Sequence, residues 1–581
     1  MGPFRTPAET SPVIRQLDTI ADQTRYDFVV AGAGAAGMAA ALFAAIAGKK
    51  VLLVERTEFL GGTTAFSAGT VWAPNTLHAA GSGDTPEKAE RFLDLVVGNY
   101  ARPAMRRAFL GSAPDAIAAL EAHTDVKFRP YPLHPDYVQE VEGATLRGRA
   151  LEPVPFDGRE LGDAFGVLRA PIPEFTILGG MMVNRADIDN LMKMTKSRAA
   201  FVHAAKILAR HARDRLRYPR GTRLVMGNAL AGRLLLSLIK RGVDFVLETS
   251  VTSIEQSNGA ITGVVLKCKG VTRQVNASAL ILAGGGFTRN ASRRQQFLHQ
   301  PVPEVSPSAP GHTGELQELA LTLGARFGEG NYDNAFWTPV SVRKRADGTT
   351  AVFPHFVLDR AKPGTVCVNA AGRRFVNEST SYHLFARAMF DTHKASPCIP
   401  AFLIADAVAL RRYGLGMVRP GGHGLKAFLA DSYLTQGTTL SELAQKLGID
   451  AGNLERTVAD MNRYAVTGVD PDFGRGSTPY HRAAGDPGVK PNPNLGPIAT
   501  PPFYAVRLLP GDIGAANGLV TSEDAQVLGA GDRPIGGLYA CGNDMQSVMG
   551  GTYPGPGITL GPGIAFAFRA VRHALSGDRV S

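Results

Sequence analysis

Cysteine is scarce in this sequence, and the few cysteines present form no regular pattern. No two of the four cysteines form a Cys-x-x-Cys pair, which argues against a structural zinc site and against a secreted disulfide framework. We therefore expect no metal site and a reducing, cytoplasmic location. Residues 1–25 lack a charged head followed by an apolar run, so they do not form a secretion signal. They are expected to form a loose N-terminal arm.

A long uninterrupted hydrophobic run is also lacking. Residues 28–48 come nearest, because they are almost wholly apolar and about long enough to cross a bilayer. They contain four glycines and are flanked closely by charged residues, so a buried strand, a glycine turn and a helix account for them without a membrane. Zinc-finger spacings, a basic aromatic groove and RNA-binding signatures are missing as well, and we expect no nucleic-acid partner.

Positive charge is in excess, with a formal net charge of +11. Part of the excess is local, since residues 193–223 carry ten Lys or Arg against a single acid. Apolar residues recur there at helical spacing, namely Phe201, Ala205, Leu208, Ala212 and Leu216. The pattern predicts an amphipathic basic helix. The preferred interpretation is a surface helix that buries this apolar stripe, and the alternative is peripheral contact with an anionic membrane.

Glycines near the N-terminus stand between a strand-like run and a helix-like run. A buried strand is expected at 26–31, a helix at 35–47 and a second strand at 51–55. The first glycine of the intervening motif permits a tight turn, the second lets the backbone approach a pyrophosphate, and the third lets the helix pack on the strand. The helix N-terminus attracts phosphate, and an acid at the end of the second strand can accept ribose hydroxyls. The predicted dinucleotide contacts are Gly32, Gly34, Ala36, Gly37 and Glu55.

Further small-residue loops decide between NAD and FAD. One follows Glu55 directly, another contains three glycines at 284–286, and a third spans residues 537–544 near the C-terminus. A cofactor contacted by both ends of the chain fits an extended FAD better than NAD. The additional FAD contacts expected are Arg56, Gly62, Thr63, Thr64, Ser67, Ala68, Gly69, Val251, Gly285, Gly542, Asn543, Thr559 and Leu560.

In this order the four loops resemble the flavoprotein family that joins fumarate reductases and 3-oxosteroid dehydrogenases, over nearly the whole chain after Arg25. The resemblance implies an α/β fold with a Rossmann-like FAD-binding domain built from both chain ends and an inserted α+β substrate domain. It also implies non-covalent FAD, because the early loop reads Gly-Gly-Thr-Thr and lacks the histidine that carries covalent flavin. The expected division is an arm at 1–25, FAD-binding segments at 26–299 and 493–581, and the substrate domain at 300–492.

The C-terminal loop separates the branches of that family. The fumarate reductase branch needs Arg and His for a dicarboxylate, yet residues 549–562 contain neither, and a buried dianion without partners is costly. The run Tyr553-Pro-Gly-Pro-Gly557 is instead similar to the 3-oxosteroid 1-dehydrogenase motif. There the tyrosine hydroxyl and the last glycine N–H bind the ketone oxygen. The resemblance thus implies an oxyanion hole formed by Tyr553 and Gly557.

The same resemblance implies a proton acceptor. Residues 369–382 are similar to a family segment whose final tyrosine takes the substrate proton, which points to Tyr382. A free tyrosine has a pKa of about 10, so a partner is expected to lower the pKa of Tyr382. A second tyrosine has this role in the family. Tyr137 is its expected counterpart and Tyr131 is a rival, because this chain has Tyr137-Val138 where family members often have Tyr-Tyr.

Together these features predict an FAD-dependent desaturase that acts on the α,β carbon–carbon bond of a 3-oxosteroid or a similar small, apolar cyclic ketone. The electron acceptor is not identified by the sequence. The same chemistry at another ring position, ene-reduction in the reverse direction and a fumarate-reductase-like activity remain alternatives. A flavin-binding electron carrier without turnover is the alternative from a different class.

Overall fold

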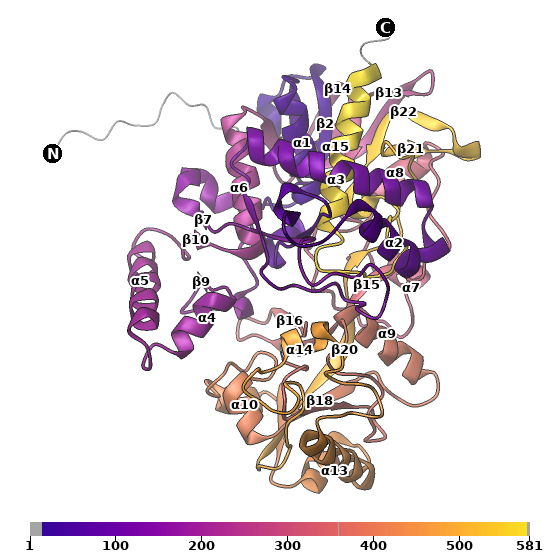
Figure 1. The fold of residues 1–581 in the computed structure, drawn as a ribbon. Coiled ribbons are helices and arrows are strands. Elements are labelled where there is room, and N and C mark those ends of the chain that lie inside the picture. Colours follow the sequence, from indigo (N-terminus) through magenta and orange to yellow (C-terminus); the bar gives the residue numbers. More distant parts are fainter. Residues whose placement is uncertain (1–13, 358, 578–581) are drawn as a thin grey trace, which may run out of the picture.

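A nine-stranded sheet forms the centre of the upper part of the molecule in Figure 1. Its order is β1-β11-β3-β2-β14-β13-β22-β21, with β12 paired to β13. The run from β1 to β14 is parallel, and β22 lies parallel to β14. The strands are β1 (Ile14–Arg15), β2 (Thr24–Ala31), β3 (Val51–Val54), β11 (Asp244–Val246), β12 (Ser250–Ser257), β13 (Ala260–Cys268), β14 (Val271–Leu282), β21 (Gln526–Leu528) and β22 (Pro534–Ala540). Both ends of the chain therefore build one sheet, as the sequence predicts.

Helices cover this sheet, and most residues of α1 are buried. It contacts α6 and α15, and its alanines can be buried on all sides because they need little space. The rings of Phe43 and Phe568 lie 5.1 Å apart across the contact between α1 and α15. The helices of this part are α1 (Ala35–Ile46), α2 (Pro86–Val97), α3 (Pro103–His123), α6 (Met226–Lys240), α7 (Ala291–Phe297), α8 (Glu315–Thr322) and α15 (Leu560–Gly577).

The computed structural model describes residues 14–577 with the exception of 358. Within that range no helix is long and apolar enough to cross a membrane. The apolar run at 28–48 instead forms β2, the glycine turn and α1, in agreement with the expected order of elements.

An antiparallel sheet organises the inserted segment, which occupies the lower part of Figure 1. Its order is β16-β15-β20-β18-β17, with β19 added to β20. The strands are β15 (Ala335–Lys344), β16 (Thr350–Pro354), β17 (Thr365–Val368), β18 (Ala401–Ala405), β19 (Leu434–Gly437) and β20 (Phe503–Ala515). The helices are α9 (Tyr382–His393), α10 (Ala407–Tyr413), α11 (Leu425–Ala430), α12 (Leu440–Leu447), α13 (Ala451–Thr467) and α14 (Pro479–Ala484).

The division of the chain at residue 493 stays a prediction, but strand pairing argues for a later return to the parallel sheet. Strand β20 begins at Phe503 and pairs with β15 and β18 of the inserted sheet. The next strand, β21, is the first after the insert to join the parallel sheet. A strand-like run shows where a strand forms, but it does not show which sheet the strand joins.

The expected loose N-terminal arm differs from what the structure shows. Residues 1–13 lie outside the described part of the chain. From Ile14 onward the chain is packed, because β1 pairs with β11 at the edge of the parallel sheet. Leu17 and Ile20 are buried in the core. The prediction of an arm is therefore wrong for residues 14–25, where a two-residue strand was too short to recognise in the sequence.

Two helices project at the left of Figure 1, next to several short strands. They are α4 (Arg185–Met192) and α5 (Arg198–Asp214), and the short strands near them are β7 (Phe156–Asp157), β8 (Thr176–Ile177), β9 (Met181–Met182) and β10 (Arg223–Leu224). A separate three-stranded sheet consists of β4 (Val71–Trp72), β5 (Phe128–Pro130) and β6 (Ala150–Pro153). The expected basic helix exists as α5, but it does not bury the expected stripe. Ala200, Ala204 and Ile207 face inward, whereas Phe201 is 55% exposed and Leu216, just beyond the helix, is 83% exposed.

Candidate active site

The first glycine loop joins β2 to α1 at the carboxyl edge of the parallel sheet. Gly32 has a φ of +109°, and a Cβ atom there would lie 2.2 Å from the carbonyl oxygen of Ala283. A Cβ on Gly37 would meet the carbonyl oxygen of Gly32 at 1.8 Å. A Cβ on Gly34, in contrast, would have no neighbour within 4 Å. Two glycines thus allow close packing, and the third leaves the backbone open to a ligand, as the motif predicts.

The other loops predicted to bind a cofactor converge on this turn. Gly62 lies against Gly34, since a Cβ on Gly62 would be 3.3 Å from the Cα of Gly34. A Cβ on Gly542 would meet Ala36 at 3.1 Å. The C-terminal loop therefore reaches the first turn of α1, where N–H groups and the helix dipole favour an anion.

Glu55 is 6% exposed and fastens the glycine loop to the loop that follows β3. Its Oε2 accepts a hydrogen bond of 3.0 Å from the amide of Ala33, and its Oε1 accepts one of 2.9 Å from the amide of Thr57. The amide of Ala35 donates to the hydroxyl of Thr64 at 3.1 Å. Glu55 and Thr64 hold the start of α1 in place, and contact of Glu55 with a ribose stays a prediction.

The remaining predicted residues of the second loop have different surroundings. Thr63 accepts a hydrogen bond of 2.8 Å from the amide of Ala309, and Arg56 forms an ion pair of 3.0 Å with Glu315. Arg56 and Val251 line one cleft. Ser67 and Gly69 instead pack against Gly227 at the start of α6, and Ala68 is exposed. Sequence spacing alone did not separate the residues that face the glycine turn from those that face α6.

A buried carboxylate connects the two later glycine loops. Asp544 accepts hydrogen bonds from the amides of Gly284 and Gly286 at 2.5 and 2.9 Å. Burial raises the pKa of Asp544 to about 6. Gly285 lies between these two glycines and against His312. In this loop Gly542 and Asn543 were predicted as contacts and Asp544 was not, although an acid directly after the Gly-Asn pair is visible in the sequence.

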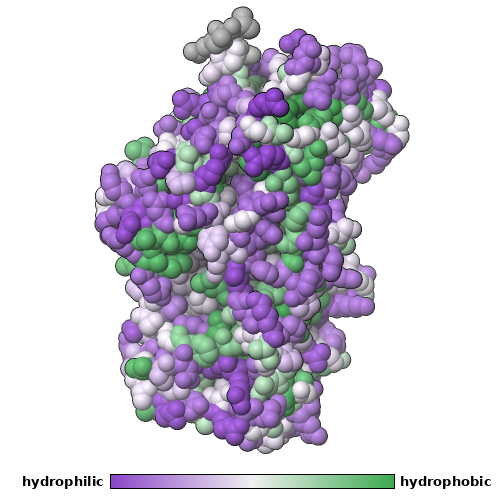
Figure 2. Space-filling view, turned by 90° about the vertical axis from the view of Figure 1, so that its right-hand side faces the viewer, coloured by the Kyte–Doolittle hydropathy of each residue, from purple (hydrophilic) through white to green (hydrophobic). Residues whose placement is uncertain are grey.

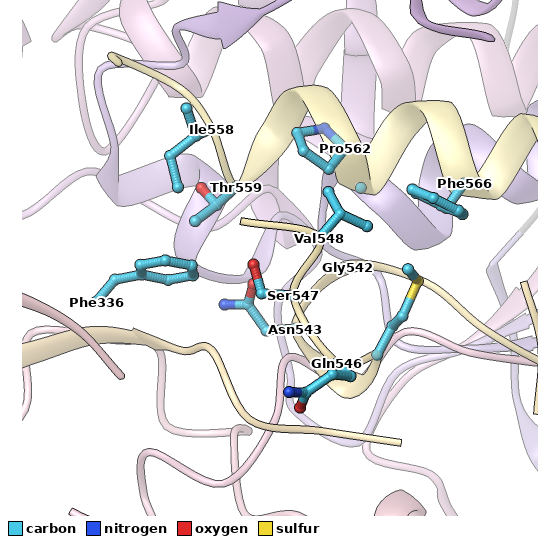
Figure 3. A pocket seen from close by; sticks show the side chains of 12 residues that line it. Phe336, Gly542, Asn543, Gln546, Ser547, Val548, Ile558, Thr559, Pro562 and Phe566 are labelled. Carbon is cyan, nitrogen blue, oxygen red and sulfur yellow. The ribbon is translucent and has the colours of Figure 1, made fainter. Parts of the chain in front are cut away.

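A narrow pocket lies beside the N-terminal end of α15 (Figure 3). Gly542, Asn543 and Thr559 line it, and all three were predicted as cofactor contacts. Figure 3 shows Asn543 and Thr559 pointing into the same space, with Phe336 of β15 approaching from the inserted domain. Leu560 begins α15 at this place. The pocket therefore lies where the parallel sheet domain meets the insert.

Three predicted tyrosines meet at this boundary, although they are far apart in the sequence. The hydroxyl of Tyr137 donates a hydrogen bond of 3.3 Å to the hydroxyl of Tyr382. The rings of Tyr382 and Tyr553 are 5.0 Å apart, and those of Tyr137 and Tyr553 are stacked at 5.7 Å. All three are less than a tenth exposed. Tyr131 packs instead on His134, so Tyr137 is the one of the two rivals that contacts Tyr382 in this structure, and its supporting role stays a prediction.

Tyr137 and Tyr553 are held together by their loops. The amide of Tyr137 donates to the carbonyl of Pro554 at 2.8 Å. The preceding residue, Asp136, accepts hydrogen bonds of 2.8 Å from Trp72 and from Arg149. A buried carboxylate needs such a charged partner and further donors to offset its desolvation. This arrangement fixes the loop of Tyr137 against the loop that carries Tyr553.

Position 557 lies in the same loop as Tyr553 and can hold only a glycine. Its φ is +89°, and a Cβ would lie 2.2 Å from the carbonyl oxygen of Thr70. The carbonyl of Gly557 accepts a hydrogen bond of 3.2 Å from the amide of Trp72. The position is thus tied to β4, and any larger side chain would displace the loop.

Tyr382 is the first residue of α9, whose N-terminus is capped by Ser381. Before it runs a loop that Arg360 holds through hydrogen bonds to the carbonyls of Glu378 and Thr380. The Glu378 carboxylate is itself buried between Arg374 and Arg475. The charged residues near Tyr382 therefore serve to position the loop.

Burial determines the ionisation of the tyrosines. It raises the pKa of Tyr553 to about 12 and that of Tyr382 well above its usual value, and neighbouring phenols raise the pKa of Tyr382 further. From the sequence, a partner was expected to lower the pKa of Tyr382. That expectation is wrong for this arrangement, because burial disfavours the phenolate and the interactions with Tyr137 and Tyr553 raise the pKa of Tyr382 as well.

Other aromatic residues near the tyrosines were missed by the sequence analysis or left without a role. The ring of Tyr480 lies 4.8 Å from that of Tyr137, and Phe356 lies 5.0 Å from Tyr382. His383 lies 5.8 Å from Tyr553 and accepts a hydrogen bond from the amide of Trp337 at its Nδ1. Its pKa is lowered to about 4 by burial, so it is neutral. Tyr480 lies in a Pro-rich segment without a recognisable motif, and no sequence signal pointed to it.

Comparison with known proteins agrees with this geometry. A family model described as FAD binding domain matches residues 27–560. The 4-oxocyclohex-2-ene-1-carboxylate 5-dehydrogenase of Sinomonas cyclohexanicum is 36% identical over 96% of this chain and 94% of that protein. The 3-oxosteroid 1-dehydrogenase of Mycobacterium tuberculosis H37Rv is 35% identical over 94% of this chain and 98% of that protein.

A solved structure is similar over nearly the same length. It is the 3-ketosteroid Δ1-dehydrogenase of Sterolibacterium denitrificans in complex with 1,4-androstadiene-3,17-dione, with a TM-score of 0.89 and 36% identity. The match covers 95% of this chain and all of that one. The chain therefore belongs to the FAD binding domain family and is an FAD-dependent oxidoreductase. Within this class it is of the 3-ketosteroid dehydrogenase and oxocyclohexene dehydrogenase kind.

The residues present fit FAD. Gly34 offers open backbone at the start of α1, the N-terminal ends of α1 and α15 approach each other around Gly542, and the pocket beside α15 extends toward Tyr553 through Phe336. The N-terminal end of α1 suits a pyrophosphate. The N-terminal end of α15 suits a ring system that becomes negatively charged. Both ends of the chain would thus contact one extended cofactor.

Replacing Glu55 by alanine is expected to weaken FAD binding. The change removes the acceptor for the amides of Ala33 and Thr57, and hydrogen bonds to charged groups contribute enough for a roughly 10- to 100-fold change in affinity. FAD affinity is measured by titrating the apoprotein while following flavin fluorescence. Glu248→Ala serves as the control, because Glu248 pairs with Lys269 at the surface. Unchanged FAD affinity in Glu55→Ala would contradict the assignment.

Proposed function

We propose that the protein desaturates the α,β carbon–carbon bond of a neutral cyclic ketone, with a 3-oxosteroid as the favoured substrate. The observation that carries this proposal is the group formed by Tyr137, Tyr382 and Tyr553 beside the glycine loops. It brings together a hydroxyl that can polarise the ketone, a phenol that can accept a proton once it is ionised, and a hydrogen-bonding partner in one buried place. FAD, bound without a covalent link, supplies the hydride acceptor.

Each residue has a defined part in this reaction. The Tyr553 hydroxyl and the Gly557 amide donate hydrogen bonds to the ketone oxygen, which stabilises the enolate charge as it develops. The proton on the carbon next to the ketone passes to the Tyr382 oxygen, with Tyr137 hydrogen-bonded behind it. The neighbouring carbon loses a hydride, and the carbon–carbon double bond forms. Phe336, Phe356 and Tyr480 exclude water from the reacting atoms.

The charges around the tyrosines favour an uncharged substrate over a carboxylate. Arg360, beside Tyr480, already donates to three backbone carbonyls. Arg387 already binds Asp333 and the carbonyl of Tyr332. The neutral state of His383 leaves no charged partner from that residue either. Burying a carboxylate here would cost several kcal/mol, whereas a ketone needs hydrogen-bond donors alone.

Anaerobic titration of the FAD-loaded enzyme tests this function. A 4-ene-3-oxosteroid is expected to bleach the oxidised flavin spectrum rapidly, and 4-oxocyclohex-2-ene-1-carboxylate much more slowly. Bleaching by the carboxylate alone would contradict the neutral substrate, and a flavin that stays oxidised with every cyclic ketone would contradict desaturation.

Acid denaturation of the same preparation tests how FAD is bound. It should release free FAD, and flavin that stays with the polypeptide would contradict a non-covalent link.

The rate of flavin reduction is expected to rise with pH. The proton acceptor must be a phenolate, and the pKa of Tyr382 lies above its usual value, so the reactive fraction is small at neutral pH. That fraction grows about tenfold per pH unit between roughly pH 6 and 9. Stopped-flow measurement of flavin bleaching at saturating ketone gives the profile. A rate independent of pH over this range would contradict proton removal by Tyr382.

A further inference from the structure

The helical hairpin formed by residues 185–217 exposes apolar side chains to an unusual degree. It comprises α4, a short turn, α5 and the turn that follows. Five large apolar side chains of the hairpin are exposed, namely Ile188, Met192, Phe201, Val202 and Leu216. Single exposed apolar residues are normal on a protein surface, but several on one projecting hairpin indicate an interaction surface.

The same hairpin carries a dense positive charge. Its exposed basic residues are Lys193, Lys196, Arg198, Lys206, Arg213, Arg215 and Arg217. In the described part of the chain, none of these seven takes part in an ion pair. Of the hairpin's acids, Asp187 is buried against Arg223 and His203, and Asp214 is buried against Thr222, while Asp189 is exposed. The charge of the hairpin is therefore strongly positive and free to meet an anionic surface.

The geometry of α5 explains why both kinds of side chain point outward. Its inner face consists of Ala200, Ala204 and Ile207, followed by the buried His211. Phe201 and Val202 fall on the outer side, and Lys206 and Arg213 are exposed as well. Long basic side chains can extend past neighbouring apolar groups and keep their charges in the polar layer. An outer face of this composition suits the boundary between lipid headgroups and acyl chains.

The segment that leads into the hairpin is anchored to the insert. Phe175, just before β8, packs on Phe353 of the insert at 5.2 Å. Glu174 forms an ion pair of 2.8 Å with Arg345. In Figure 1 the hairpin projects from one side of the molecule. The opposite side, seen in Figure 2, is mainly hydrophilic with separate apolar patches. The hairpin is thus a defined projection that can approach a surface without rearrangement of the domains.

We propose that this hairpin docks the protein on the surface of an anionic lipid bilayer without crossing it. The apolar residues insert between headgroups, and the basic residues bind lipid phosphates and carboxylates. A second copy of this chain is a poorer partner, because two hairpins would bring seven unpaired positive charges against seven more. The proposal is independent of the ketone assignment, since it rests on the surface of the hairpin alone.

Vesicle flotation with the FAD-loaded full chain tests the proposal. The protein is expected to float with vesicles of phosphatidylcholine and phosphatidylserine, to remain at the bottom with phosphatidylcholine alone, and to dissociate as salt is added. Absence of binding to the anionic vesicles at low salt would overturn the proposal. Equal binding to both kinds of vesicle would overturn the role of the basic residues.

Variants locate the contact. Lys206→Glu with Arg213→Glu is expected to weaken binding about 25-fold or more, taking about fivefold for each lost basic residue. Phe201→Ser with Leu216→Ser is expected to weaken it about tenfold or more. The matched control is Val466→Ser with Val469→Ser, which removes two exposed apolar side chains elsewhere and should bind as the unaltered protein does. Binding that survives both hairpin variants would overturn the assignment.

Two further measurements guard against misfolded variants and a different occupant. FAD content and flavin reduction by a water-soluble cyclic ketone should be unchanged in every hairpin variant. Phe201→Trp should show a blue shift of its fluorescence on anionic vesicles, because Trp72 and Trp337 are fully buried and contribute a constant signal. The contrary outcome is an unaltered protein that does not bind vesicles and sediments as a dimer, with a Phe201→Ser, Leu216→Ser variant that sediments as a monomer. That outcome would identify a second copy of the chain as the partner of the hairpin and refute membrane docking.

Discussion

Replacing Tyr382 by phenylalanine is expected to slow flavin reduction by the ketone about 100- to 10,000-fold, the range that general acid–base groups contribute. The hydroxyl of Tyr382 accepts a hydrogen bond from Tyr137. The ring of Tyr382 contacts the rings of Tyr137, Phe356 and Tyr553. The substitution removes one oxygen atom and leaves the aromatic packing unchanged. Stopped-flow kinetics at saturating ketone isolate this step from product release and from the electron acceptor.

The control for this variant is Tyr464→Phe. Tyr464 lies on α13, and its hydroxyl donates a hydrogen bond of 2.9 Å to Asp472. It packs in a different hydrophobic cluster from the three tyrosines. It should reduce its flavin as the unaltered protein does. Tyr382→Phe should retain FAD and lose the rise of rate with pH. Loss of FAD would assign Tyr382 a structural role, and a normal rate would exclude it as the proton acceptor.

Replacing Tyr553 by phenylalanine is expected to lower turnover about 100- to 1,000-fold, as the removal of one oxyanion-hole donor does. Tyr553 stacks on Tyr137 and meets Phe336 edge to face at 5.3 Å, so a phenylalanine fits the same space. The loss arises because the Gly557 amide remains as the sole donor to the ketone oxygen. Steady-state kinetics with a 4-ene-3-oxosteroid measure the effect.

The pH profile separates the two tyrosine variants. Tyr553→Phe keeps the proton acceptor, so its lower rate should still rise with pH. Tyr382→Phe should lose that rise. If both variants showed the same flat profile, the division of roles between polarisation and proton removal would fail. If Tyr553→Phe retained full turnover, the proposed oxyanion hole would have to lie elsewhere.

Local patterns in the sequence predicted how the first glycine turn is built, and the cofactor contacts stay predictions. The motif from Gly32 to Gly37 and the acid at Glu55 follow from rules about how a strand, a turn and a helix connect. The meeting of Gly62 with Gly34 and of Gly542 with Ala36 depends on distant segments. Family resemblance supplied those pieces, but it did not show that Asp544 joins the glycine loops.

The tyrosines could be predicted from the sequence only in part. Motifs pointed to Tyr382 and Tyr553, but the choice between Tyr137 and Tyr131 as the partner of Tyr382 stayed open. A loop without regular structure has no periodicity that fixes which of its residues points inward. A lowered pKa for Tyr382 was expected from the chemistry required. Burial, which no short segment reveals, raises that pKa instead.

The inward face of α5 was placed one residue away from its true position. Residues 199–212 include several alanines next to Phe201 and Leu208, so two neighbouring faces have similar apolar character. Tertiary contacts decide between them, and small residues at Ala200 and Ala204 allow the closer approach. The larger Phe201 remains outside, which a search for large apolar residues could not predict.

The pairing of β22 with β14 has a consequence for biosynthesis. The strand that ends at Leu282 leaves the ribosome long before the strand that begins at Pro534, by roughly 10 to 50 seconds at about 5–20 residues per second. During that interval the nascent chain exposes an unfinished sheet and lacks the Gly542 loop that meets Ala36. Flavin capture must therefore wait until the Gly542 loop has been made, and until then the half-built sheet depends on protection from aggregation.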